Sequence, residues 1–395
     1  MKNNPELLKA VQYFTREKAI MTGLLLVCEA GRRTETAMDG DVKENSIFDL
    51  ASLTKLFTGL CAMRLKEEGL LDPGRPVFYF DPRFTKLKDT TAEQLMSFTA
   101  ELKTPGRIDD CRSREEALNC LFGTVLAGEP KGRHYSDIPS MVLKYVIEAA
   151  AGMPLMDFVR ETVLDKAGMD ETWVKVPAER IGDCQRYDPE YRIINGKRIR
   201  RTGLEPGVPH DPKAAVIQAG TEDLCGHAGL FSTAADMIRF CRAILEEKIV
   251  NRESLREMAT NRTGHLKPDG TYTQYLGYQC YVRHPDQYFS EIPRYMGRQA
   301  FGNAGFTGNH LSVDPERGNY VFFLGNRVKG KLTMLVPEAG KTLEDYGLCA
   351  DGSGTVVWDD GTHISSSVKY VHQKDEHLHS VIARVLGLKE IDFDS

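Results

Sequence analysis

The chain carries one long apolar segment with helical periodicity, Asp49-Leu50-Ala51-Ser52-Leu53-Thr54-Lys55-Leu56-Phe57-Thr58-Gly59-Leu60-Cys61-Ala62-Met63. Between Leu50 and Met63 the one charged residue is Lys55, and a helix this apolar on most sides is buried. Lysine is seldom fully buried without a partner. Residues three positions apart share a helix face, so Lys55 lies one turn from Ser52, near the helix start, where backbone N–H groups are unpaired.

A serine with a buried amine beside it is typical of nucleophilic acyl transfer. The hydroxyl is a weak nucleophile until a base removes its proton, and burial lowers the pKa of a lysine by disfavouring its charged form. We therefore expect Ser52 to be acylated and Lys55 to act, uncharged, as its base. The pattern Ser-x-x-Lys also occurs by chance: Ser366 and Lys369 fit it, but in a polar stretch without an apolar helix.

Composition sets broad limits on the protein. A chain of 395 residues forms one large domain or two lobes. Its formal net charge of -5, without a long block of like charge, indicates neither a nucleic-acid nor a membrane partner. No apolar run reaches the roughly 18 residues that span a bilayer, and no apolar signal core follows Met1. Nine scattered cysteines indicate a cytoplasmic protein without disulfides.

Hydrophobic periodicity places strands near both chain ends and helices between them. We expect strands at 22–28, 32–38, 277–283, 299–304, 308–313 and 319–324. We expect helices from Pro5, over the segment quoted above, and at 91–98, 114–122, 137–151, 154–167, 233–245, 253–258 and 368–386. Residues 176–224 read as a long irregular loop, and the centre of 328–366 fits no element.

This order of elements predicts an α+β fold. One antiparallel β-sheet would be built from both chain ends and flanked by helices, with an all-helical lobe inserted. We expect residues 1–395 to form a single catalytic domain. Its sheet lobe would cover about 1–75 and 225–395, and its helical lobe about 76–224.

Four stretches, in order, resemble the serine β-lactamase and penicillin-binding-protein-like superfamily, in particular its class C-like esterase and peptidase branch. They are residues 48–55, 132–137 with the helix that follows, 226–236, and 301–308 with 314–318. Order and spacing agree along about residues 20–330. The resemblance implies a β-lactamase/transpeptidase-like fold and a serine hydrolase that forms an acyl-enzyme on a small ester or amide, without a cofactor or metal.

The resemblance also implies roles for individual residues. Ser52 matches the nucleophile and Lys55 its base, while Tyr135 would share the proton transfer and protonate the leaving group. Asp137 stands where the family usually has Asn, and would face the substrate with a negative charge. The backbone N–H groups of Ser52 and Phe306 would form the oxyanion hole.

One strand departs from the family pattern. Asn303-Ala304-Gly305 aligns with Lys-Thr-Gly or His-Thr-Gly, so the cation and hydroxyl that would hold a substrate carboxylate are missing. These three residues would still border the substrate. We therefore favour an esterase or D-amino-acid peptidase over a β-lactamase or D-alanyl-D-alanine carboxypeptidase. His210 and His227 are expected to support the site.

A non-catalytic alternative stays open. The departures at Asp137 and Asn303 would suit a sensor or binding module with a penicillin-binding-like fold, whereas intact Ser52, Lys55 and Tyr135 favour an enzyme. No Gly-x-Ser-x-Gly elbow and no phosphate-binding glycine loop occur. The histidines between residues 372 and 379 are interpreted as a solvated helix face and not as metal ligands. The sequence leaves the oligomeric state and the acyl and leaving groups open.

Overall fold

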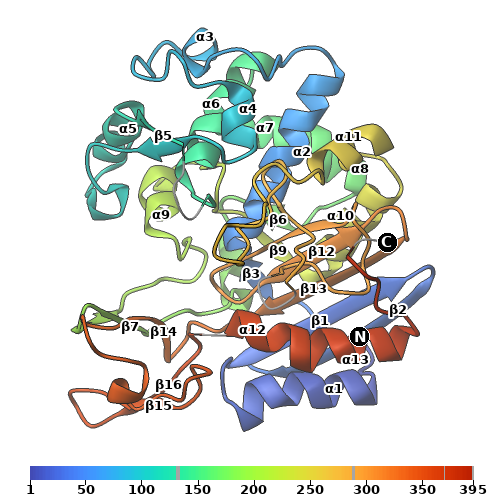
Figure 1. Ribbon diagram of the computed structural model, residues 1–395, viewed down its shortest axis with the longest axis vertical. Helices are drawn as coiled ribbons and strands as arrows, with labels where there is room; N and C mark the ends of the chain where they lie inside the picture. The colour runs from blue at the N-terminus through green and yellow to red at the C-terminus, as the bar shows by residue number, and fades with distance from the viewer. Residues whose placement is uncertain (130–133, 287–289, 369, 394–395) are drawn as a thin grey trace.

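The computed structural model of the protein describes residues 1–129, 134–286, 290–368 and 370–393. Its largest sheet has six antiparallel strands in the order β10-β11-β12-β13-β1-β2 (Figure 1). The bounds are β1 Gly23–Ala30, β2 Arg33–Gly40, β10 Tyr281–Val282, β11 Phe301–Ala304, β12 His310–Asp314 and β13 Asn319–Gly325. Because β1 pairs with β13, from Leu24 opposite Gly325 to Ala30 opposite Asn319, the sheet is built from both chain ends, as predicted.

Helices cover both faces of this sheet. Alternate residues of a strand face opposite sides, so Leu24 and Leu26 of β1 pack with α1 and α13, whereas Leu25 and Val27 belong to the apolar cluster that contains α2 and α10. The bounds are α1 Pro5–Gln12, α2 Thr54–Glu67, α10 Ala234–Leu245, α12 Tyr370–Lys374 and α13 Ser380–Leu386. A π-helical segment, Asp375–His379, joins α12 to α13 where the sequence predicts one helix.

The helix α2 runs from the sheet into a lobe of shorter helices, where it packs beside α6 and α11 (Figure 1). The bounds are α3 Val77–Phe80, α4 Ala92–Met96, α5 Arg114–Phe122, α6 Ile138–Ala151, α7 Leu155–Val159, α8 Asp165–Ala167, α9 Pro212–Gln218 and α11 Arg252–Met258. The α+β prediction is confirmed, with one difference. Residues 76–224 are not all helical, because they also contain the short strands β4 Glu101–Lys103, β5 Val125–Gly128, β6 Thr172–Trp173, β7 Glu190–Ile194 and β8 Lys197–Arg201.

A second, smaller sheet lies at one corner of the molecule (Figure 1). Its order is β14-β7-β8, with β14 at Lys331–Val336, and a hairpin of β15 Thr355–Val357 and β16 His363–Ser365 lies beside it. Tyr191, Leu332 and Trp358 share its small apolar core. The expectation of an irregular loop at 176–224 is therefore wrong, because this segment forms the β7–β8 pair, and β7 also pairs with β14, about 140 residues further along the chain.

No helix among the described residues is long and apolar enough to cross a membrane. All nine cysteines are free thiols, and most of them are buried.

Candidate active site

Ser52 lies at a tight turn between a strand and the helix α2. The strand β3, Ile47–Asp49, pairs with β9, Phe231–Thr233, and a 3-10 turn at Ala51–Leu53 then leads into α2. Ala51 adopts a positive φ of 48°, a conformation that is unfavourable for a side chain larger than glycine. Asp49 holds the turn, because its carboxylate accepts the N–H of Ala51 at 2.8 Å and that of His210 at 2.7 Å.

Lys55 is fully buried one helical turn after Ser52. Its Nζ lies 3.0 Å from Ser52 Oγ, 2.8 Å from Asp137 Oδ1 and 3.2 Å from the carbonyl oxygen of His227. Burial alone would lower the pKa of Lys55, but the Asp137 carboxylate and Tyr135 outweigh burial and raise it above its ordinary value. The structure therefore brings Ser52 and Lys55 together, but the expectation of an uncharged amine is wrong.

Tyr135 lies beside this pair. Its ring centroid is 4.9 Å from Lys55 Nζ, and the ring stacks on Tyr281 at 5.0 Å. The Tyr135 hydroxyl donates to Asn303 Oδ1 at 3.2 Å, while the Asn303 amide donates to the carbonyl oxygen of Gln279 at 3.4 Å. Asn303 is fully buried and does not line the cavity. The structure thus places Asn303 behind Tyr135 and not against the substrate space where we expected it.

Ala304, the last residue of β11, and Gly305, which follows it, do border the cavity. A Cβ atom on Gly305 would lie 2.8 Å from the carbonyl oxygen of Leu50 and 3.4 Å from Cβ of Ala51. Glycine is therefore required for β11 to approach the turn that carries Ser52. Phe306 follows directly, so its backbone lies at the same junction.

Three side chains surround the Phe306 ring. The His210 ring stacks on it at 5.5 Å, and the guanidinium carbons of Arg327 and Arg192 lie 4.5 and 5.4 Å from its centroid. Arg327 Nε also donates to the carbonyl oxygen of Phe306 at 2.7 Å. His210 is buried and its Nε2 lies 2.9 Å from Glu190 Oε2. His210 thus contacts Phe306 and the Asp49 turn without reaching Ser52 through any recorded hydrogen bond.

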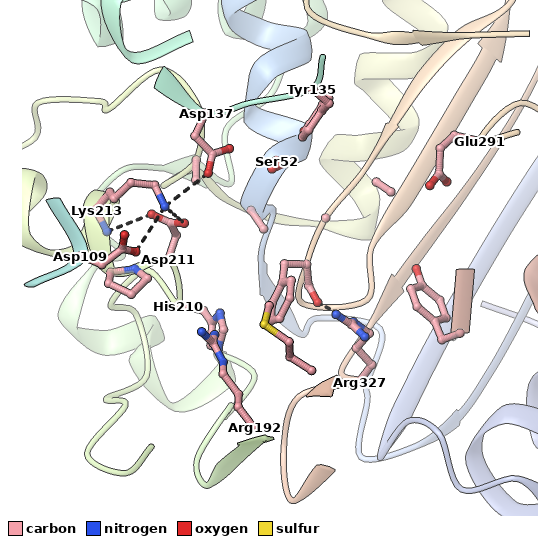
Figure 2. A pocket seen from close by; sticks show the side chains of 18 of the residues that line it. Ser52, Asp109, Tyr135, Asp137, Arg192, His210, Asp211, Lys213, Glu291 and Arg327 are labelled. Atoms are coloured by element: carbon pink, nitrogen blue, oxygen red, sulfur yellow. Dashed lines mark hydrogen bonds and ion pairs between the residues drawn. The ribbon is translucent and has the colours of Figure 1, made fainter. Parts of the chain in front are cut away.

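A network of charges surrounds the far side of Asp137 (Figure 2). Lys213 Nζ lies 3.3 Å from Asp137 Oδ2, 3.0 Å from Asp211 Oδ2 and 3.4 Å from Asp109 Oδ1. His227 Nε2 lies 2.9 Å from Asp211 Oδ1. Burial opposes charge on the imidazole, but the Asp211 carboxylate outweighs burial and raises the pKa of His227 to about 10. His227 is therefore a buried imidazolium that supports the network.

The sequence analysis did not identify Lys213, Asp211 or Asp109 as part of the site. One signal was available, because Asp211 precedes Pro212 and caps α9 by accepting the N–H of Lys213 at 3.0 Å and that of Ala214 at 3.1 Å.

Among the described residues, Asp137, Asp211 and His227 present donor atoms within 4.8 Å of one another. Both carboxylates already pair with ammonium groups, those of Lys55 and Lys213. The set therefore suits a balanced charge network, and a metal ion would have to displace a lysine from it. Of the motif residues quoted from the sequence, Gly132, Arg133 and Lys369 lie outside the described residues.

These residues enclose a cavity of about 360 Å³ (Figure 2). Its lining includes Ser52, Tyr135, Asp137, His210, Lys213, Ala304, Gly305 and Phe306, together with Arg192, Arg327 and Met334. Arg192 and Met334 come from β7 and β14 of the small sheet. That sheet therefore forms part of the cavity wall, which the sequence analysis did not foresee.

Comparison with known proteins agrees with this geometry. A family model described as Beta-lactamase matches residues 9–337. The chain belongs to the β-lactamase family. The chain is also 27% identical over 313 residues to a putative D-alanyl-D-alanine carboxypeptidase of Salmonella enteritidis PT4, covering 72% of this chain and 70% of that protein.

Solved structures share the β-lactamase fold with this chain. A D-amino acid amidase from Ochrobactrum anthropi SV3 superposes with a TM-score of 0.63 at 16% identity, over 96% of this chain and 99% of that one. A class C β-lactamase mutant superposes with a TM-score of 0.60 at 15% identity, over 81% of this chain and 91% of that one. The family match and the shared fold together indicate an enzyme of the hydrolase type.

Proposed function

We propose that this β-lactamase family member is a serine hydrolase that forms an acyl-enzyme at Ser52 on a small ester or amide. The observation that carries the proposal is the 3.0 Å contact between Ser52 Oγ and Lys55 Nζ in the wall of a cavity. Ser52 attacks the substrate carbonyl, and the N–H groups of Ser52 and Phe306 hold the oxyanion. Water then releases the acyl group.

The proton transfer requires Ser52, Lys55 and Tyr135 to work as one unit. Because Asp137 keeps Lys55 charged, this unit must lose one proton before Ser52 can give up its own. The Ser52 proton then passes to the vacated site on Lys55 or Tyr135, and Tyr135 returns a proton to the leaving group. We assign Asn303 the task of positioning Tyr135, through the 3.2 Å hydrogen bond between them.

The substrate is most consistent with an ester or a D-amino-acid derivative. The Asn303 side chain lies behind Tyr135, and Ala304 supplies no hydroxyl, so the cation and the hydroxyl that the family uses to hold a carboxylate beside this strand have no equivalent here. We also propose D-amino-acid amides and peptides as candidate substrates, because the similar proteins include a putative D-alanyl-D-alanine carboxypeptidase and a D-amino acid amidase. β-Lactam hydrolysis is expected to be slow.

A labelling experiment tests the nucleophile. A fluorophosphonate probe should modify the wild-type protein on the peptide that contains Ser52, and should not modify the Ser52→Ala variant. Turnover of p-nitrophenyl esters, D-alanyl peptides and nitrocefin should then fall at least about a thousandfold in Ser52→Ala. Folded wild-type protein that is neither labelled nor active would instead support the non-catalytic binding module.

Two coarser features accompany this proposal. We propose a single domain with lobes at about 1–75 with 225–395 and at about 76–224, because one apolar cluster contains residues of β1 and of α6. We also propose a cytoplasmic location, which the nine free thiols support. Cell fractionation and limited proteolysis check the two statements.

A further inference from the structure

The end of the cavity away from Asp137 carries two arginines (Figure 2). Arg192 comes from β7 of the small sheet, and Arg327 lies two residues after β13 of the large sheet. Their guanidinium groups lie 5.4 and 4.5 Å from the centroid of the Phe306 ring. Both cations therefore lie next to the residue whose backbone N–H we assign to the oxyanion hole.

Arg327 is a buried cation that pairs with no carboxylate in the part of the chain that the structure describes. The residue is 7% exposed, and its guanidinium donates to the carbonyl oxygens of Phe306 at 2.7 Å and Ser367 at 2.8 Å. No carboxylate among the described residues lies within 4.0 Å of it. Burial accordingly lowers the pKa of Arg327. A buried charge is normally paired, so an uncompensated one in a cavity wall points to an anion from outside the chain.

The nearest carboxylate is already shared. Glu190 accepts Arg192 Nε at 2.6 Å and Arg192 Nη2 at 3.1 Å, and the same carboxylate also binds Arg201 at 2.7 Å and His210 at 2.9 Å. Arg192 Nη1 has no recorded hydrogen bond among the described residues. This end of the cavity thus holds more guanidinium groups than carboxylates.

The carboxylates elsewhere in the cavity wall do not offset this excess. Asp137 and Asp211 pair with Lys55 and Lys213, and Asp109 also contacts Lys213. Glu291 pairs with the buried Lys374. With the His227 imidazolium beside Asp211 counted, these four carboxylates are matched by four cations, so the arginine end remains positive.

We propose that Arg192 and Arg327 bind a carboxylate carried by the acyl part of the substrate. The inference rests on the proposed function, which also indicates in which direction the acyl part of the substrate extends from Ser52. Tyr135 protonates the leaving group, so the leaving group lies on the Tyr135 side of Ser52 and the acyl part extends toward Phe306. These cations lie beside Phe306 and not at Asn303, so they would bind a different part of the substrate from the family's strand cation. The substrates are ω-carboxyacyl esters or amides.

Paired substrates test this assignment. The p-nitrophenyl monoesters of glutaric and adipic acids are compared with their neutral terminal amides, with rates corrected for hydrolysis without enzyme. The wild-type protein should prefer the carboxylates about tenfold or more in kcat/KM, and added salt should reduce the preference. Arg192→Gln should reduce the preference about tenfold, while Arg192→Lys should retain part of it because charge remains.

Arg201→Gln is the matched control, because Arg201 binds the same Glu190 carboxylate but does not line the cavity. It should leave the preference within about twofold of wild type. Arg327→Gln should also reduce the preference. A thermal unfolding measurement shows whether this variant folds. If Arg327→Gln does not fold, the result for Arg192→Gln alone tests the carboxylate assignment.

The outcomes separate the two proposals. Turnover of both substrates at equal kcat/KM, or an Arg192→Gln variant with an unchanged preference, overturns the carboxylate assignment and leaves the serine hydrolase standing. An equal loss of preference in Arg201→Gln also overturns it, because the effect would then belong to the Glu190 cluster. Wild-type protein that hydrolyses neither ester and shows no fluorophosphonate label on Ser52 overturns the proposed function itself.

Discussion

Asp137 Oδ1 lies 2.8 Å from Lys55 Nζ and keeps the buried amine beside Ser52 in its charged form. The family usually has Asn at the position of Asp137, which could not hold a lysine charged in this way. The sequence analysis expected burial both to place Lys55 beside Ser52 and to keep it uncharged, and the Asp137 carboxylate makes the second expectation fail. Burial positions the amine next to the nucleophile, while its protonation is set by a residue 82 positions further along the chain.

The first prediction concerns the pH dependence of turnover. The catalytic unit must lose a proton, so kcat/KM should rise with pH. Removing the carboxylate in Asp137→Asn lowers the pKa of Lys55, and the rising limb should move to lower pH by about one unit or more. Asp223→Asn is the control, because it removes a carboxylate from another buried lysine, Lys144, away from the cavity. An unmoved limb in Asp137→Asn would show that Lys55 does not govern the limb.

The second prediction concerns Lys55 itself. Lys55→Met should lose turnover at least about a thousandfold, because neither proton transfer nor charge stabilisation remains. The protein should still fold, with a loss of about 1–3 kcal/mol in the free energy of unfolding. This loss lies at or below that of a typical broken buried pair, because Lys213 remains 3.3 Å from Asp137. Urea unfolding and ester kinetics measure the two quantities, and near-normal turnover would remove Lys55 from the mechanism.

A third prediction tests the approach of β11 to the Ser52 turn. In Gly305→Ala the new methyl group would lie 2.8 Å from the carbonyl oxygen of Leu50, so β11 and Phe306 must move away from Ser52. We expect kcat to fall tenfold or more, with a smaller change in KM, because one oxyanion donor is displaced. Gly182→Ala is the control, since its Cβ would meet no atom within 4 Å. Equal kcat values for both variants would argue against the Phe306 oxyanion donor.

The fourth prediction concerns stability and pH. The pKa of His227 rises from 6.5 to about 10 on folding. A raised folded-state pKa stabilises the protein below pH 6.5, and this contribution, on the order of a few kcal/mol, is lost as pH rises through 10. The melting temperature should therefore fall over this window, and it should fall less steeply in His227→Gln. Parallel slopes for both proteins would show that His227 is uncharged in the folded state.

Local patterns sufficed for most of the fold. The helix α2 and the strands β1 and β13 follow from apolar spacing that each segment carries by itself, and the order of strands and helices along the chain predicted one sheet built from both chain ends. The small sheet could not be foreseen, because β8, Lys197–Arg201, is almost entirely charged and β7 is held by a segment about 140 residues away. Non-local pairing of this kind leaves no period in either segment.

The active site likewise contains features that local spacing predicts and features that depend on residues far apart in sequence. Ser52 lies on the 3-10 turn that runs directly into α2 and Lys55 lies in the first turn of α2, so their contact could be predicted from their three-residue spacing. The charge on Lys55 depends on Asp137, which is 82 residues away in sequence, so it could not be predicted from the spacing of residues within α2. Arg192 reaches the cavity from β7 and Arg327 from the segment after β13, so no short motif contains them both.

The small sheet also constrains how members of this family can be recombined. Its central strand, β7, lies between β8 and β14, so a graft of residues 190–201 into another member would arrive without the strand that holds Arg192 at the cavity. Transplanting residues 331–336 alone would bring Met334 without Arg192, its partner on β7. Any exchange of substrate preference by this route must therefore move the two segments as a pair, and chimaeras carrying only one should misfold locally at this corner.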